Sequence, residues 1–206
     1  TVGAVYKHYA RSHVDSWTLS RNMLRNRGVK YQDNDPAAGK LSEYQSDETE
    51  NKLRYERVYT SLPFKLSLGA GLRYASYSNE AERLTLEAGR FVSRSTSAEA
   101  RLFAYTAFAQ ASDEYLDRRL KVALGLNLVG NTLNARMSNP LPQLSPRLSL
   151  SFALTEDIDL NANLGRYAMR PSYTLMGYRA SDGSYPNQER LGYIISHQAV
   201  LGAEYH

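Results

Sequence analysis

The sequence offers few residues that could perform catalysis. The four histidines, His8, His13, His197 and His206, show neither the H-E-x-x-H pattern nor the paired spacing of a metal site. The run Asp33-Asn34-Asp35 begins like a calcium loop, but alanines follow where further oxygen ligands and a glycine are needed. Cysteine is absent, and neither G-x-S-x-G nor a G-x-G-x-x-G after a strand occurs. We therefore predict a protein that is not an enzyme and that holds no metal and no cofactor.

Tyrosines and arginines in the polar stretches suit ligand binding better than catalysis. Tyr occurs 16 times, against 5 Phe and 1 Trp. Aromatic faces and guanidinium groups grip flat or anionic molecules such as an iron chelate, a porphyrin or a glycan. The same residues also suit a membrane-interface belt, where a tyrosine ring lies in apolar surroundings and its hydroxyl in water. The candidate ligand contacts are Trp17, Tyr44, Arg166, Arg170, Tyr173, Tyr178, Arg179 and Tyr185.

A second polar set alternates with apolar residues. Between residues 148 and 154 every second residue is Leu or Phe, and between residues 158 and 164 every second one is Ile, Leu or Ala. This period of two predicts a hairpin of two strands with a turn at residues 155–157. The intervening side chains share the opposite face, which we expect to line a water-filled lumen. The predicted lumen-facing set comprises Lys65, Arg73, Lys121, Asn127, Arg147, Ser149, Ser151, Asp159, Asn161 and Asn163.

The length of these strands favours a membrane protein. Soluble strands average about 5 to 6 residues, whereas each arm of this hairpin can be continued for about ten, the length that a tilted strand needs to cross a bilayer. The pattern therefore indicates an all-β, antiparallel up-and-down transmembrane β-barrel. A soluble antiparallel β-sheet protein that binds a ligand or a partner is the alternative, with the apolar face as its core. Further strands are predicted at residues 1–10, 51–59, 64–74, 101–111, 120–130 and 193–206.

Composition agrees with strands rather than helices in the membrane. The mean hydropathy is −0.51, and no window contains the roughly 20 apolar residues of a membrane helix. A barrel strand exposes only every second side chain to lipid, so its average hydropathy is polar. The net charge of +4 is spread along the chain without a basic tract, so no nucleic-acid partner is expected.

Long and short connections alternate along the predicted sheet of about eight strands. Short turns are predicted at residues 62–63, 112–117 and 155–157. Outer-membrane barrels carry long loops outside the cell and short turns on the periplasmic side. The long loops are predicted at about residues 11–50, 76–98, 131–143 and 169–192.

Several motifs resemble the barrel of the TonB-dependent outer-membrane receptors of Gram-negative bacteria. They are Asn139-Pro140-Leu141, Leu144-Ser145-Pro146-Arg147-Leu148, Asn163-Leu164-Gly165-Arg166-Tyr167, Pro171 with Tyr173, and Gly177-Tyr178-Arg179. The resemblance extends to residues 105–130 and 192–205. It implies uptake of a scarce nutrient, such as an iron chelate, haem, a vitamin or a glycan, across the cell outer membrane. The barrel of this family has about 22 strands around a plug domain.

The resemblance also sets the expected extent and partners of the chain. Eight strands are about a third of such a barrel, and the chain starts at Thr1 without Met and stops at His206 within a strand. We expect residues 1–206 to be a fragment of the barrel domain, without the plug domain and the C-terminal strands. The expected partners are outer-membrane lipid and lipopolysaccharide, the plug domain and remaining strands of the same receptor, TonB through an N-terminal part, and a small nutrient ligand.

Overall fold

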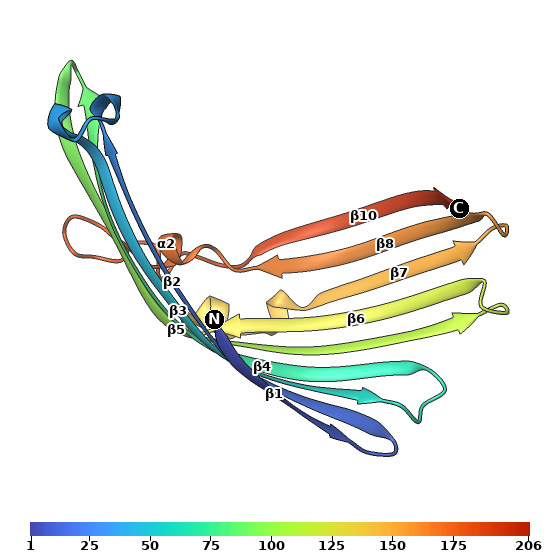
Figure 1. The fold of residues 1–206 in the computed structure, drawn as a ribbon. Coiled ribbons are helices and arrows are strands. Elements are labelled where there is room, and N and C mark those ends of the chain that lie inside the picture. The colour runs from blue at the N-terminus through green and yellow to red at the C-terminus, as the bar shows by residue number, and fades with distance from the viewer.

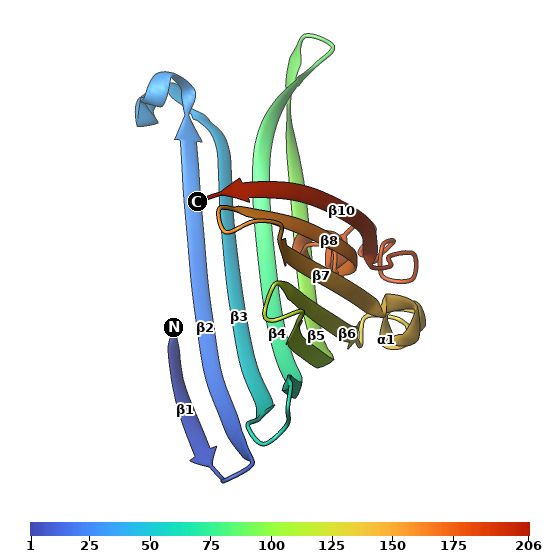
Figure 2. The same cartoon turned by 90° about the vertical axis from the view of Figure 1, so that its right-hand side faces the viewer.

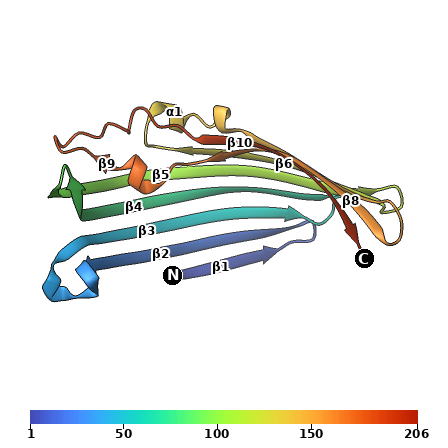
Figure 3. The same ribbon diagram turned by 90° about the horizontal axis from the view of Figure 1, so that it is seen from above.

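A computed structural model describes all 206 residues, and its strands form one antiparallel sheet. Nine strands pair in chain order, and the short β9 pairs with β5 (Figures 1 and 3). The sheet is open and curved, with β1 and β10 at its two edges (Figure 2). The strands are β1 (Val2–Tyr9), β2 (His13–Tyr31), β3 (Lys40–Tyr59), β4 (Lys65–Glu87), β5 (Arg90–Tyr115), β6 (Leu120–Asn131), β7 (Ser145–Ala153), β8 (Ile158–Met169), β9 (Tyr178–Arg179) and β10 (Ile194–Tyr205).

Helical structure is confined to the connections. Two short α-helices, α1 (Ala135–Ser138) and α2 (Tyr173–Met176), lie in the loops after β6 and β8. Three single 3-10 turns, Gln32–Asn34, Pro36–Ala38 and Leu141–Gln143, complete the helical content. None of these helices has the length and apolar character needed to cross a membrane.

The prediction of a long loop over residues 11–50 was wrong, because these residues form β2 and the first half of β3. Alternation failed as a signal here because the upper part of this hairpin has no continuous apolar face. Ion pairs across the strands contribute instead, with Arg25 Nε 2.5 Å from Asp47 Oδ1 and Arg27 Nη2 2.9 Å from Glu43 Oε1. Because β2 was not predicted, the sheet has one more long strand than expected, and β1 is joined to β2 by a short turn.

The predicted loop over residues 76–98 was wrong for the same reason. β4 and β5 continue through it and meet at Ala88 and Gly89, which both have positive φ, as a tight hairpin turn requires. Arg94 and Glu87 pair across the strands, with Nη2 and Oε2 2.8 Å apart. The β2–β3 and β4–β5 hairpins therefore rise well beyond the other strands (Figure 1). The loops after β6 and β8 agree with the predicted ranges 131–143 and 169–192 to within a few residues.

The register separates two faces of the sheet. One row of successive register partners runs from β4 to β8, and its side chains share what we call the outer face. This row consists of Leu66, Ala111, Leu124, Leu148 and Leu164. The adjacent row of partners, Lys65, Ser112, Ala123, Ser149 and Asn163, defines the inner face. By register, all ten predicted lumen-facing residues lie on this inner face.

The sheet has almost no core of its own. Only 15 of the 206 residues are buried, and the outer-face residues Leu124 and Leu164 are 56% and 55% exposed. The single buried apolar cluster lies on the inner face, where the loops after β6 and β8 fold over β4 and β5. It consists of Ala75, Ala100, Leu102, Met137, Tyr173 and Met176. An apolar outer face of this extent requires lipid or another apolar partner.

Candidate functional site

Two basic side chains oppose each other across β3 and β4 on the inner face. Lys52 and Arg73 are direct partners in the register, although like charges in such positions destabilise a sheet. Glu50 offsets this repulsion, because its Oε2 lies 2.5 Å from Lys52 Nζ and its Oε1 lies 3.4 Å from Arg73 Nη1. Glu50 is buried, with 7% of its surface exposed. The two strands thus hold one carboxylate between two cations.

The loop after β8 adds a third cation and a phenol to the same carboxylate. Arg170 Nη2 lies 3.7 Å from Glu50 Oε1, and the Arg170 guanidinium lies 3.8 Å from the centre of the Tyr173 ring. The Tyr173 hydroxyl donates a hydrogen bond of 2.6 Å to Glu50 Oε1, although the two residues are 123 positions apart in the sequence. Burial of the phenol and this hydrogen bond raise the pKa of Tyr173 to about 12. The phenol therefore remains a donor at physiological pH.

Helix α2 holds Tyr173 in place. Ser172 caps the helix, and its side chain accepts a hydrogen bond from the backbone N–H of Leu175. The ring of Tyr77 on β4 stacks on the Tyr173 ring, with centroids 5.7 Å apart. The Tyr77 and Thr174 hydroxyls are also hydrogen-bonded at 2.9 Å. These contacts join the loop after β8 to the inner face of the sheet.

A cavity of about 510 Å³ opens beside this cluster on the inner face. Its size falls within the range of small-molecule sites. Four positively charged side chains and no carboxylate line it. A cleft whose walls carry only positive charge and have a low dielectric constant raises the local concentration of anions. The lining includes Lys52, Arg54, Arg73, Phe108, Arg170 and Tyr193.

The ring of Phe108, which lines this cavity, packs over a glycine of β4. A Cβ atom at Gly69 would lie 2.3 Å from the Phe108 ring and 2.7 Å from the Tyr55 carbonyl oxygen, so the ring lies directly over the glycine backbone. The Arg54 guanidinium lies 4.8 Å from the centre of the Phe108 ring, on the side of the lumen-facing row. Arg54 also donates to Glu56 Oε2 at 3.1 Å. The cavity wall therefore presents an aromatic ring and a cation together.

Eight of the ten predicted lumen-facing residues line one of two hollows of the inner face. Arg73 and Asn127 line the cavity described above. Arg147 lies apart, 4.5 Å from the centre of the Tyr167 ring, and Asp159 lies 3.2 Å from His206. That this face lines a lumen stays a prediction. The remaining six line a second hollow of about 820 Å³ near the short turns: Lys65, Lys121, Ser149, Ser151, Asn161 and Asn163.

Of the eight candidate ligand contacts, only Arg170 and Tyr173 come together at this cavity or its rim. Trp17 was wrongly assigned to a loop. It lies in β2, close to a short turn, and stacks on Tyr55 on the outer face with ring centroids 4.4 Å apart. Tyr44 lies on β3, with its ring over Gly28.

The other four candidates make separate contacts, and Arg166 was wrongly assigned to a loop, because it lies near the end of β8. Arg166 donates to the backbone carbonyls of Pro142 and Leu144 and so fixes the loop before β7. Tyr178 and Arg179 form β9, which pairs with the upper edge of β5. Tyr185 is half-buried in the loop that follows. No shared binding surface of these four is evident from the contacts that they make.

Sequence reasoning missed Glu50 and Lys52 as site residues. Glu50 fell in a segment that was interpreted as a loop. Lys52 lies at the start of the strand predicted at residues 51–59, and it was not assigned to either face of the sheet. The alternation of Lys52, Arg54 and Glu56 with apolar Leu53 and Tyr55 was the available signal. The contact between Glu50 and Tyr173 had no signal, because it depends on how a distant loop folds.

We expect Gly177→Ala to release the loop after β8 from the sheet. A Cβ atom at this position would lie 2.4 Å from the Glu99 carbonyl oxygen, and the Glu99 amide donates to the Gly177 carbonyl at 2.8 Å. Such overpacking costs about 1–3 kcal/mol. Limited trypsin digestion should cut faster at Arg179 and Arg190 in the variant. Gly202→Ala is the control, because no atom lies within 4 Å of a Cβ there. Equal cleavage of the two variants would contradict the close packing.

Comparisons with known proteins give one family and one fold. The family model described as TonB dependent receptor-like, beta-barrel, matches residues 1–205. A solved structure described as the copper transporter OprC is similar with a TM-score of 0.68 at 15% sequence identity. The similarity covers 99% of this chain and 35% of that one, so the chain spans about a third of that protein's length. At this identity the likeness concerns the fold alone. A comparison with curated protein sequences gave no match.

Proposed function

Because this chain belongs to the TonB-dependent receptor β-barrel family, we propose that it forms part of the wall of a receptor that takes up an anionic nutrient complex. The family consists of outer-membrane receptors and transporters rather than enzymes. The resemblance seen in the sequence and the expected antiparallel barrel segment are both confirmed. The exposed leucines of the outer face support contact with lipid over the alternative of a soluble binding protein.

The basic cavity carries the proposal on the ligand. The Phe108 ring and four cations line it: Lys52, Arg54, Arg73 and Arg170. Two carboxylates compensate only part of this charge, because Glu50 pairs with three of the cations and Glu56 with Arg54. Carboxylate, catecholate or phosphate oxygens of a ligand would satisfy the guanidinium groups. Among the nutrients considered, a negatively charged iron chelate or haem with its carboxylates suits this wall better than a neutral glycan. A bare copper cation, the cargo in the name of OprC, is a poor match for four cations.

The remaining partners follow from the same proposal. The inner face would contact the plug domain, and energy for transport would come through TonB bound to another part of the receptor. Outer-membrane lipid and lipopolysaccharide would surround the outer face. The tall β2–β3 and β4–β5 hairpins would project outside the cell, since they exceed by far the 9 to 11 or so residues that cross a bilayer.

Ligand binding by the intact receptor tests the proposal. We expect Arg73→Ala to weaken binding of a negatively charged ferric chelate about 10- to 100-fold, because one charge-assisted hydrogen bond contributes about 1.5–3 kcal/mol. A neutral chelate of similar size should lose little. Lys65→Ala is the matched control, since Lys65 is an inner-face cation that lines the other hollow. Binding can be measured by quenching of intrinsic fluorescence in detergent. Equal losses for Arg73→Ala and Lys65→Ala, or a preference for neutral chelates, would contradict an anion site here.

A further inference from the structure

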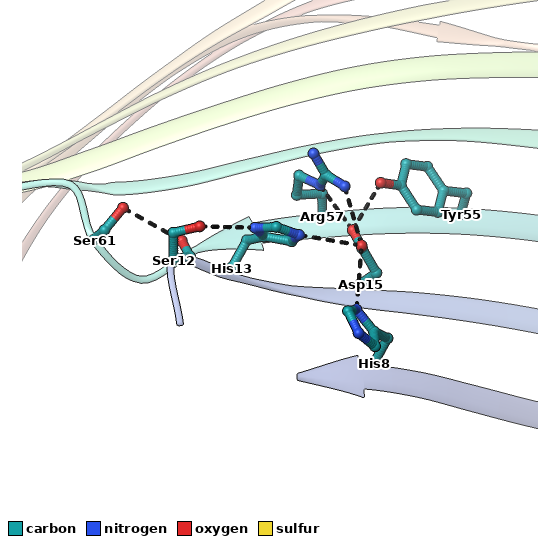
Figure 4. Close-up of polar contacts among 7 residues, drawn as sticks. All are labelled: His8, Ser12, His13, Asp15, Tyr55, Arg57 and Ser61. Carbon is teal, nitrogen blue, oxygen red and sulfur yellow. Dashed lines mark hydrogen bonds and ion pairs between the residues drawn. The ribbon is translucent and has the colours of Figure 1, made fainter. Parts of the chain in front are cut away.

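Two histidines and an aspartate converge on the outer face at the short-turn end of β1 and β2 (Figure 4). His8, His13 and Asp15 each present one ligand atom, and these three atoms all lie within 4.8 Å of one another. His13 Nε2 lies 3.4 Å from Asp15 Oδ2, and His8 Nδ1 lies 3.9 Å from the same oxygen. Ligands that bind one ion at about 2 Å in tetrahedral geometry lie about 3.3 Å apart. The cluster therefore comes close to coordination spacing.

The sheet itself produces this arrangement. His13 and Asp15 are two residues apart on β2, so their side chains share a face. His8 is the direct register partner of Asp15 on β1. The spacing along the chain gave no sign of a metal site, because the third ligand comes from across the hairpin. The pattern H-x-D with a histidine on the paired strand supplies two imidazoles and one carboxylate.

Hydrogen bonds around the cluster leave one coordination position free on each ligand. The carboxylate of Asp15 has about four lone-pair sites. Arg57 Nε and the Tyr55 hydroxyl take those of Oδ1 at 2.8 and 2.7 Å, and Arg57 Nη2 takes one of Oδ2 at 3.0 Å. The remaining site on Oδ2 faces the two imidazoles, and neither histidine makes a hydrogen bond to it.

The neighbouring turn orients His13 for metal binding. Ser12 Oγ lies 3.0 Å from His13 Nδ1, and when Nδ1 donates to this oxygen, Nε2 keeps its lone pair toward Asp15. Hydrogen bonding of the far ring nitrogen is the usual support of a histidine ligand. Ser12 is itself held, since its carbonyl accepts from the Thr60 amide at 2.8 Å and from the Ser61 hydroxyl at 3.4 Å. The site thus rests on two joined turns.

We propose that His8, His13 and Asp15 form a binding site for a divalent transition-metal ion at the periplasmic rim of the barrel. Two imidazoles and one carboxylate suit Zn(II) and Cu(II), and Cu(II) binds such sites most tightly. Water would complete the coordination, because the His8 side chain is 56% exposed. The site lies on the opposite face from the basic cavity, so it is separate from the proposed path of the nutrient. A bound ion would join β1 to β2 beside the turn, while Arg57 orients the carboxylate.

Copper binding by the whole receptor tests this site. The receptor is purified in detergent, stripped of metal with a chelator and titrated with Cu(II) in a non-coordinating buffer at neutral pH. We expect electron paramagnetic resonance to show one bound Cu(II) with splitting from two imidazole nitrogens. His8→Ala and His13→Ala should each remove this signal, and Zn(II) should compete for it. Ser12→Ala should weaken binding about 10- to 100-fold while keeping the two-nitrogen signature.

A matched control separates this site from other copper ligands in the receptor. His197→Ala changes an exposed histidine of β10 that lies on the outer face, as the cluster does, and this variant should leave the signal intact. Unchanged heat-modifiability on a gel verifies that each variant is folded. If the His8→Ala, His13→Ala double variant binds the same number of copper ions as the wild type, the cluster is only a hydrogen-bonded network and the proposal is overturned. A wild-type spectrum with one or no nitrogen ligand has the same consequence.

Discussion

Leu150→Arg is expected to lower the folding stability of the receptor in lipid by about 2–4 kcal/mol, the cost of an arginine on the lipid face near the bilayer midplane. Leu150 lies on the outer face, in register with Val122 on one side and Ala162 on the other. No polar group of these neighbours could accept the guanidinium. The charge would therefore have to stretch toward the headgroups or draw water into the bilayer.

Ser151→Arg is the matched control, one residue further along β7. Ser151 faces inward and lines the hollow of about 820 Å³ with Lys121 and Asn161. An arginine there has room and water, so a far smaller loss is expected. Folding into lipid vesicles, followed by gel mobility with and without heating, measures both variants. Equal damage from the two substitutions would show that the outer and inner faces have been exchanged.

Glu50→Gln is expected to destabilise the receptor by about 2–3 kcal/mol and, at the same time, to tighten its binding of anions. The change leaves Lys52, Arg73 and Arg170 without their shared carboxylate. Removal of one partner from a buried ion pair costs about 3–5 kcal/mol. We expect a smaller loss of about 2–3 kcal/mol because these pairs are only partly buried: the three cations keep between a quarter and about a third of their side-chain surface exposed.

The opposite signs of the two effects make Glu50→Gln informative. Stability is measured by urea unfolding in lipid vesicles, and affinity by titration with the negatively charged ferric chelate. Glu56→Gln is the control for stability alone, because Glu56 pairs with Arg54, whose side chain is 56% exposed, and such pairs contribute at most about 1 kcal/mol. A weaker affinity for the anion in Glu50→Gln would mean that the carboxylate, and not the cations, serves the ligand.

Sequence patterns predicted best the strands that cross the membrane. In β4, β6, β7 and β8 one face must be apolar and the other small or polar, so a period of two is imposed on the sequence itself. The same physics assigned the ten inner-face residues, because a strand residue has only two faces to choose from. Short turns at Leu62-Pro63 and at residues 155–157 were also readable from their composition.

The upper halves of β2, β3, β4 and β5 were not predictable in this way. Beyond the bilayer neither face needs to be apolar, and pairing relies on backbone hydrogen bonds and on ion pairs such as Arg25 with Asp47. Charged and polar residues in such numbers also occur in loops, so local composition does not separate the two. Strand pairing, which is a long-range property, decided the outcome.

The sequence by itself determined the fold class and the faces of β4, β6, β7 and β8, because these follow from local periodicity. Only the tertiary structure decided which distant residues meet. Glu50 meets Tyr173 because the loop after β8 folds over β3 to β5, and His8 meets Asp15 because the register of β1 on β2 pairs them. Side-chain clusters of this kind depend on register and loop packing, and a one-residue shift in either would disperse them.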